Sequence, residues 1–149
     1  MVEPQPTFSD GTVWLTPWRP DDGVAIGDFN LDAEHRRWFD QPDPDPDPAA
    51  RRAHGADVVR RWQQEWADGT SQAFAVRDDP NGPALGTAEL HARPDGAGNI
   101  SYSVTPRHRR RGYAARAVRL LSVAGLTRFG YPVIELRCDP ENVASRGVA

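Results

Sequence analysis

After three strand-like segments, the spacing of apolar residues becomes helical near Gly112, and that change constrains the fold more than any other feature. Before it, three segments alternate apolar and polar residues with turn residues between them, as hairpin strands do: residues 72–77, 84–92 and 99–104. After it, residues 112–129 carry apolar and small side chains at helical spacing, and residues 132–137 read as another strand. Two strands joined through one helix form a βαβ unit and can be parallel. The pattern predicts a mixed, mostly antiparallel sheet.

The N-terminal half predicts one strand and two helices. Residues 12–19 alternate as a strand, and the Pro20-Asp21-Asp22 turn offers an N-cap to a short helix over residues 24–31. Residues 40–48 repeat Pro-Asp, and because proline disfavours helix at its own and the preceding position, we expect an extended loop. A second helix is expected over residues 49–67.

Composition narrows the classes of function. The 149 residues suit one domain, which we expect to span residues 1–149, and the net charge of −3 argues against a nucleic-acid partner. No apolar run reaches the roughly 18 residues of a membrane span. The N-terminal residues lack a basic start and an apolar run, so we expect no signal peptide. Cys138, the one cysteine, has no internal partner. These features together lead us to expect a cytoplasmic protein without a membrane partner. The histidines lack metal-ligand spacing, so we also expect no metal site.

A basic loop joins the last hairpin strand to the long helix, and it is the best candidate for a binding site. The loop contains Arg107, Arg109, Arg110 and Arg111 and ends at Gly112. The first turn of a helix has unpaired N–H groups and a partial positive charge, so it accepts a phosphate group readily. A glycine at that point removes the side chain that would keep a phosphate away. The segment therefore predicts a pyrophosphate site.

The spacing Arg109-x-x-Gly112-x-Ala114 resembles the Q/R-x-x-G-x-G/A signature of the GNAT acetyltransferase superfamily. Further on, Asp139-Pro140-Glu141-Asn142-Val143-Ala144-Ser145 resembles the helix opening that follows the fifth strand of that family. The opening segment from Leu15 to Asp22 is similar to the start of the ribosomal-protein acetyltransferase branch. The resemblance covers nearly the whole chain in the family's order. It implies an α/β (α+β) fold, with helices on both sides of the sheet and a splayed pair of central strands that hold the cofactor.

The resemblance also implies acetyl-CoA as co-substrate and an amine acceptor, either a protein N-terminus or a small molecule. The backbone near Tyr102, Ser103 and Val104 would pair with the pantetheine arm, backbone N–H groups from residues 110–115 would hold the pyrophosphate, and Asn142 would lie near the thioester. A backbone N–H near Val104 would polarise the thioester oxygen. The implied cofactor-binding residues are Tyr102, Ser103, Val104, Arg109, Arg110, Arg111, Gly112, Tyr113, Ala114, Ala115 and Asn142.

The general base is not identified by the resemblance. Some branches use a glutamate late in the fifth strand and a tyrosine in the last helix, but the matching positions here are Arg137 and Ala149. Glu89 and His91 share one face of a predicted strand, so Glu89 is our candidate base. A water relay is the alternative.

Members of this family normally continue past the last helix with two further strands, whereas this chain stops at Ala149. We therefore expect a fold truncated at its C-terminus, or a homodimer in which a second copy supplies the missing edge. Two other functions stay open. One is a non-catalytic acyl-CoA-binding module or inactive fragment, and the other is nucleic-acid binding through residues 107–111.

Overall fold

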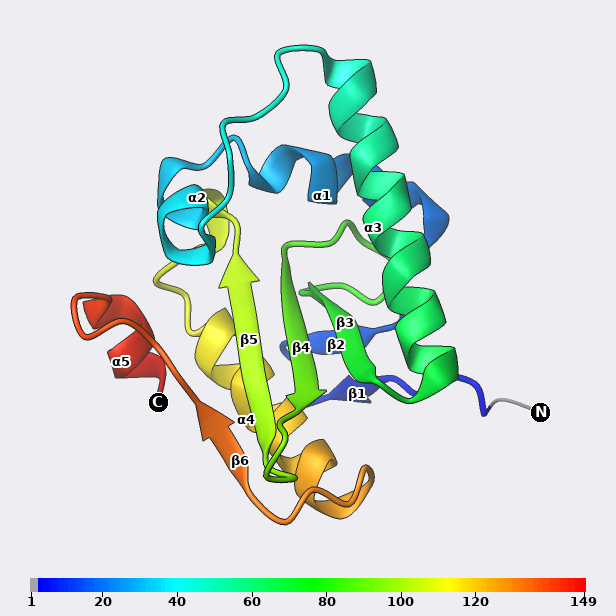
Figure 1. Cartoon of the computed structure of the whole chain (residues 1–149), viewed down its shortest axis with the longest axis vertical. Coiled ribbons are helices and arrows are strands. Elements are labelled where there is room, and N and C mark those ends of the chain that lie inside the picture. Colours follow the sequence, from blue (N-terminus) through cyan, green and yellow to red (C-terminus); the bar gives the residue numbers. More distant parts are fainter. Residues whose placement is uncertain (1–2) are drawn as a thin grey trace.

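A computed structural model describes residues 3–149 as one curled six-stranded sheet with five α-helices (Figure 1). The strands lie side by side in chain order, and every neighbouring pair is antiparallel except the last, which is parallel. They are β1 (Phe8–Ser9), β2 (Trp14–Thr16), β3 (Ser71–Arg77), β4 (Gly86–Ala92), β5 (Gly98–Val104) and β6 (Ile134–Leu136).

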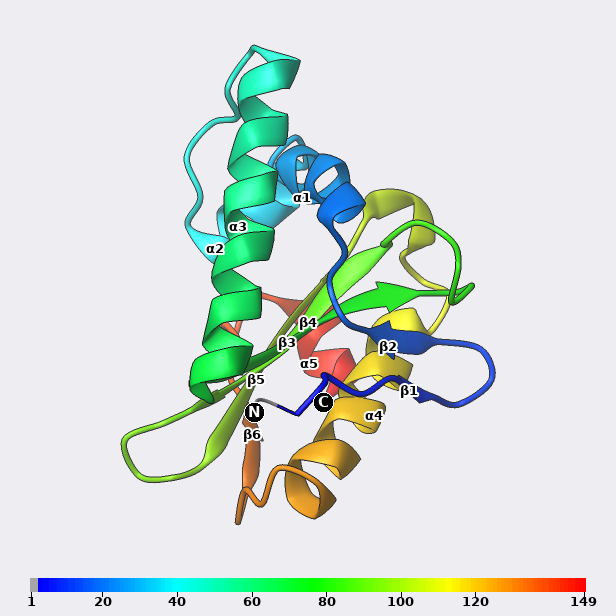
Figure 2. The ribbon, with the colours of Figure 1, turned by 90° about the vertical axis from the view of Figure 1, so that its right-hand side faces the viewer.

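The helices cover both faces of this sheet. They are α1 (Gly23–Phe29), α2 (Ala33–Phe39), α3 (Pro48–Asp68), α4 (Tyr113–Thr127) and α5 (Val143–Val148), with short 3-10 turns at Pro20–Asp22 and Pro106–His108. Figure 2 shows α1 and α3 on one side of the sheet and α4 on the other. Within residues 3–149, no helix combines the length and hydropathy that a membrane crossing requires.

Two apolar cores result from the alternation of side chains along the strands. One core packs Leu15, Phe74 and Leu90 against Leu121 of α4, and the other packs Trp18 and Ala75 against α1 and α3. Because β3 lies between the two cores, all of its residues are buried.

Glycines let α1 and α3 pack backbone against backbone. A β-carbon built on Gly55 would lie 1.8 Å from the carbonyl oxygen of Gly23, and one on Gly27 would lie 2.3 Å from that of Arg51. Only glycine fits at these contacts, since real β-carbons do not approach backbone atoms so closely. This packing fixes α1 and, through the following turn, the start of α2.

A buried ion pair ties the start of α1 to the sheet. Arg77 of β3 donates to Asp22 at 2.5 Å, to the Thr16 hydroxyl at 2.8 Å and to the Gly82 carbonyl at 2.8 Å. The Arg77 side chain is 1% exposed and that of Asp22 is 7% exposed. The charge of Arg77 is thus compensated in full by neighbouring groups, as a buried charge requires.

The structure confirms most of the expected elements, including the parallel pair and the loop at residues 40–47. Strand β1 and helix α2, which are short, were not predicted from the sequence. Helix α4 ends at Thr127, two residues before its expected end at Phe129. The expectation that the splayed strands are central is wrong within the described range, because β6 is the outermost strand there.

Candidate functional site

Strands β5 and β6 pair over only three residues and then diverge (Figure 1). Their parallel register runs from Gly98 opposite Ile134 to Ile100 opposite Leu136. Beyond Ile100, β5 continues to Val104 while remaining paired with β4 on its other side. The second half of β5 therefore has one edge with no strand neighbour within residues 3–149. An unpaired strand edge offers N–H and C=O groups to another extended molecule.

The basic loop leads from this edge to the start of α4. Gly112, the N-cap of α4, has φ +78°, and Arg110 also has a positive φ of 60°. Among residues 3–149, no side chain caps this helix, so its first-turn N–H groups lack the partner that an Asp or Ser would supply. Arg110 and Arg111 are exposed, and neither forms an ion pair with another described residue. This helix end can accept an anion.

Arg109 differs from the other arginines of the loop because its side chain is used inside the protein. Its Nε donates to the Val104 carbonyl at 2.9 Å, and its Nη1 donates to the Glu34 carboxylate at 3.3 Å. Its Nη2 forms an ion pair with Asp32. The guanidinium therefore joins the end of β5 to the start of α2.

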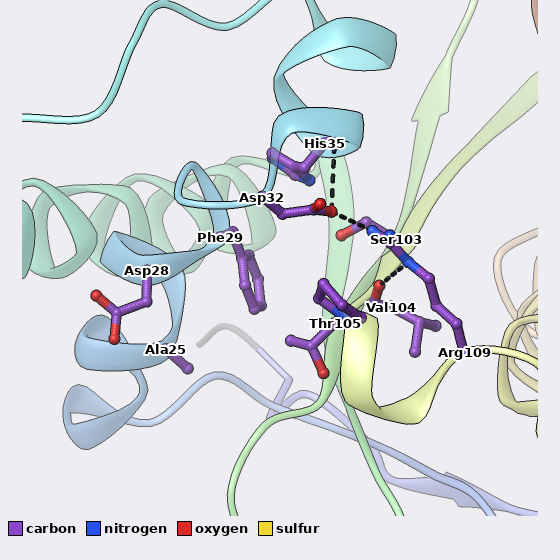
Figure 3. Close-up of a pocket in the computed structure, with 10 residues that line it drawn as sticks. Ala25, Asp28, Phe29, Asp32, His35, Ser103, Val104, Thr105 and Arg109 are labelled. Carbon is purple, nitrogen blue, oxygen red and sulfur yellow. Dashed lines mark hydrogen bonds and ion pairs between the residues drawn. The ribbon is translucent and has the colours of Figure 1, made fainter.

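A cavity of about 130 Å³ lies between α1, α2 and the end of β5 (Figure 3). Its wall on the helical side includes Phe29, Asp32 and His35, and its wall on the strand side includes Ser103 and Val104. In Figure 3 the side chain of Arg109 reaches across toward Asp32, and Asp28 lies on the opposite side of the cavity. The structure thus brings three residues that were predicted to bind cofactor, Ser103, Val104 and Arg109, together with two that were not predicted, Asp32 and His35.

The two unpredicted residues have shifted pKa values. Burial opposes ionisation of Asp32, but the hydrogen bond and charge of Arg109, together with the backbone N–H groups of Glu34 and His35, outweigh it and hold the pKa of that carboxyl below its usual value. Burial lowers the pKa of His35, and the charge of Arg109 acts in the same direction against the opposing charge of Asp32. The imidazole also stacks on Phe39, with ring centroids 4.7 Å apart. At neutral pH the cavity therefore has an ionised aspartate beside an uncharged histidine.

Tyr102 links β5 to the last helix where the two strands diverge. Its hydroxyl donates to the Ser145 hydroxyl at 2.8 Å, and the backbone N–H of Ser145 donates to the side chain of Asn142 at 3.1 Å. Burial raises the pKa of Tyr102, so its hydroxyl stays protonated. Two of the predicted cofactor residues, Tyr102 and Asn142, thus meet through Ser145. Asn142 is also the N-cap of α5, as its residue type favours.

Glu89 lies apart from this cavity. It sits on β4 opposite Ser101 of β5, accepts a hydrogen bond from the Ser71 hydroxyl at 2.8 Å and lies 3.5 Å from Nδ1 of His91. Its side chain is 15% exposed and faces a separate polar hollow of about 410 Å³ near the end of α3. Because Ser101 is the first residue after the paired part of β5, Glu89 lies one strand away from the divergence. Its role as base stays a prediction.

The remaining predicted residues surround the helix end. Tyr113 donates to Asp78 at 3.3 Å and stacks on His108, Ala114 is half-buried, and Ala115 is exposed. The sequence did hold a signal for the missed α2. Asp32 precedes an apolar pair, Trp38 and Phe39, in the manner of an N-cap, and its side chain accepts from the N–H groups of Glu34 and His35.

This combination of a mixed sheet, one diverging parallel strand pair and an uncapped helix after the pair defines an α+β domain of acetyltransferase type. The acetyltransferase (GNAT) domain model matches residues 12–149, so the chain belongs to the GNAT acetyltransferase family. No curated protein sequence matches the chain significantly.

Solved structures of several acetyltransferases share the fold at low sequence identity. RimJ of Mycobacterium smegmatis in complex with CoA-disulfide is 22% identical with a TM-score of 0.77, and the match covers 97% of this chain and 73% of that one. The ribosomal-protein-S5-alanine acetyltransferase of Vibrio fischeri is 19% identical with a TM-score of 0.74, covering 96% and 79%. Spermidine N-acetyltransferase of Vibrio cholerae, in complex with CoA and spermine, is 14% identical with a TM-score of 0.73, covering 93% and 78%.

Proposed function

We propose that this protein transfers an acetyl group from acetyl-CoA to the primary amine of a protein N-terminus or a small molecule. The observation that carries the proposal is the unpaired edge of β5 beyond Ile100, which leads to the uncapped first turn of α4. Membership of the GNAT family supports it. Related structures contain CoA, and their names describe transfer to ribosomal proteins or to spermidine.

The residues present suit acetyl-CoA in two ways. The edge of β5 from Tyr102 to Val104 can pair with the amide groups of an extended pantetheine arm, as one strand pairs with another. The first turn of α4 and the exposed Arg110 and Arg111 suit a pyrophosphate, because main-chain N–H groups and guanidinium groups both donate to phosphate oxygens. A thioester supplies an acetyl carbon that an amine can attack directly.

In the proposed reaction, the acceptor nitrogen bonds to the acetyl carbon, the bond from that carbon to sulfur breaks, and the thiolate leaves. The amine loses one proton, for which Glu89 is the proposed acceptor, acting through water because it faces a separate hollow. The thiolate gains one proton from solvent. A backbone N–H at the free edge of β5 would stabilise the negative charge on the carbonyl oxygen. The hydrogen bond from the Ser71 hydroxyl orients the carboxylate of Glu89.

Binding and turnover are tested separately. Isothermal calorimetry with acetyl-CoA measures binding, and thiol release measures turnover with alanyl and seryl peptides, spermidine and small primary amines. Binding followed by thiol release with at least one amine is the expected result. Binding without thiol release on any acceptor would favour the acyl-CoA-binding module, whereas a salt-sensitive affinity for DNA or RNA without acetyl-CoA binding would favour the nucleic-acid reading. Light scattering would show whether the protein forms a dimer, as the proposal of a second copy at the outer edge of β6 requires.

Gly112→Glu should abolish acetyl-CoA binding, because it places a carboxylate where the pyrophosphate is expected. Gly96→Glu is the matched control, since Gly96 also has a positive φ (+86°) and open space around a built β-carbon but lies in the turn between β4 and β5. Both substitutions impose similar backbone strain, of the order of 1 kcal/mol. Calorimetry should show a loss of at least about tenfold in affinity for Gly112→Glu alone. Equal affinities in the two variants would remove the pyrophosphate site from this helix end.

A further inference from the structure

Arg109 occupies the first position of the family signature, yet its surroundings differ from those of a free phosphate ligand. Its guanidinium faces two carboxylates, Asp32 and Glu34, together with the Val104 carbonyl. One positive charge against two negative charges leaves this cluster with no net attraction for an anion. Arg110 and Arg111, which are exposed beside the start of α4, keep their charges available.

The same contacts matter for α2, because this helix has little else to hold it. None of its seven residues is buried, so apolar packing contributes little to its position. Its ties to the rest of the molecule are mostly polar, apart from the contact of His35 with Phe29, whose ring centroids lie 5.9 Å apart. Arg36 donates to the Asn30 carbonyl at 2.7 Å, Arg37 pairs with Glu141 at 3.2 Å, and Arg109 pairs with the cap residue Asp32.

The ion pair made by Arg109 is less exposed than the one made by Arg37. The Asp32 side chain is 16% exposed and that of Arg109 is 32% exposed, whereas those of Arg37 and Glu141 are 62% and 76% exposed. Exposed ion pairs contribute little to stability, because water and salt screen them. Pairs that are partly buried and held by fixed partners contribute more. Asp32 also caps α2, so a guanidinium that fixes Asp32 fixes the first turn of the helix.

We infer that Arg109 is a positioning residue that ties α2 to the end of β5 and so sets the width of the cavity between them. If the proposed function holds, that cavity is part of the amine acceptor site. His35 and Asp32 line it on the side of α2. Arg109 keeps its pairing with Asp32 when acetyl-CoA binds. The pyrophosphate is held instead by the N–H groups of α4 and by Arg110 and Arg111.

The test uses Asp32→Asn, which removes the charge but keeps an efficient helix cap. Arg109→Met removes the other partner. The matched control is Asp57→Asn, which removes the carboxylate from an exposed Arg-Asp pair in α3. Hydrogen exchange of the ligand-free protein should be faster within residues 33–39 by at least about tenfold in both site variants, the factor expected for one charge-assisted hydrogen bond. Exchange elsewhere, and throughout the control, should stay unchanged.

Binding and kinetics separate a positioning role from phosphate binding. Calorimetry should find the acetyl-CoA affinity of both variants within about threefold of wild type, because neither partner binds the coenzyme. The KM for spermidine or an alanyl peptide should rise more than kcat falls, and the double variant should match the single ones, since all three lack the same interaction.

Three results would overturn the inference. The first is unchanged hydrogen exchange in α2. The second is a loss of acetyl-CoA affinity above about tenfold in Arg109→Met together with a gain of affinity in Asp32→Asn. The third is an acceptor KM that does not change although hydrogen exchange in α2 becomes faster. If wild-type protein binds no acetyl-CoA, the proposed function fails, but the exchange result still decides whether Arg109 holds α2.

Discussion

At the scale of single residues, the most demanding position is Arg77, a guanidinium buried under the start of α1. Burying a charge is tolerated here because Asp22, Thr16 and the Gly82 carbonyl all accept hydrogen bonds from it. The cluster joins β3 to β2 and to the turn at Pro20–Asp22, which lie 61 and 55 residues earlier in the chain at Thr16 and Asp22. Its contribution is therefore to orientation of α1 over the sheet as much as to stability.

Asp22→Asn should destabilise the protein by about 3–5 kcal/mol, because it leaves the charge of Arg77 buried without a counter-charge. Asp21→Asn is the control, since Asp21 is the exposed neighbour in the same turn and should change stability by less than about 0.5 kcal/mol. Urea unfolding followed by tryptophan fluorescence measures both. Similar midpoints for the two variants would mean that the buried pair is dispensable.

Single residues also show where prediction from sequence succeeds and fails. Gly112 could be identified because a backbone with positive φ at a helix start needs a residue type that is visible in the sequence. Asp32 and His35 could not be placed in the site, because their position depends on the pairing of Asp32 with Arg109, which is 77 residues away. Neither residue type is rare in loops or helices, so no local pattern marks them.

At the scale of elements, long and strongly patterned segments were predictable and short ones were not. The pattern of α3 and of the three hairpin strands repeats often enough to exceed chance, whereas β1 has two residues and α2 has no buried face. The divergence of β5 from β6 follows from a pairing that stops at Ile100, which no alternation of side chains reveals. It was expected only through the family resemblance.

The contact between α1 and α3 should fail when its central glycine is replaced. Gly55→Ala places a methyl group 1.8 Å from the Gly23 carbonyl oxygen, so the helices must separate, at a cost of about 1–3 kcal/mol or more. Gly147→Ala in α5 is the control, because its β-carbon meets open space and alanine favours helix by up to about 1 kcal/mol. Thermal unfolding should separate the two variants in opposite directions. A stable Gly55→Ala protein would mean that α1 is free to move.

At the scale of the whole molecule, charge is segregated along the chain. Residues 20–48, which form the turn, α1, α2 and the loop before α3, carry nine acidic residues and two arginines. Residues 107–119, which form the basic loop and the first half of α4, carry six arginines and no acidic residue. The small net charge of −3 is thus the sum of an acidic segment at residues 20–48, a basic segment at residues 107–119 and the rest of the chain.

Association with acetyl-CoA should slow as ionic strength rises, because the basic helix end attracts the anionic coenzyme. The Debye screening length, over which this attraction acts, falls to about 8 Å at physiological ionic strength. Stopped-flow fluorescence at several salt concentrations measures the rate constant. Replacing Arg110 and Arg111 by alanine should reduce both the rate and its dependence on salt. A rate that is indifferent to salt would indicate that entry of the coenzyme is limited by something other than electrostatic attraction.

The half-open edge of β5 also bears on how this protein can vary over evolutionary time. A ligand that is held as an additional strand reads the peptide backbone, and every residue type except proline presents the same backbone groups. In the proposed complex the edge groups belong to the backbone of Tyr102 and Val104, because the N–H groups of Ser101 and Ser103 face β4. A proline at Val104 would remove one of these edge N–H groups. Substitutions that alter the preference for an amine acceptor can therefore accumulate around this edge of β5 while the proposed backbone contact with acetyl-CoA is kept.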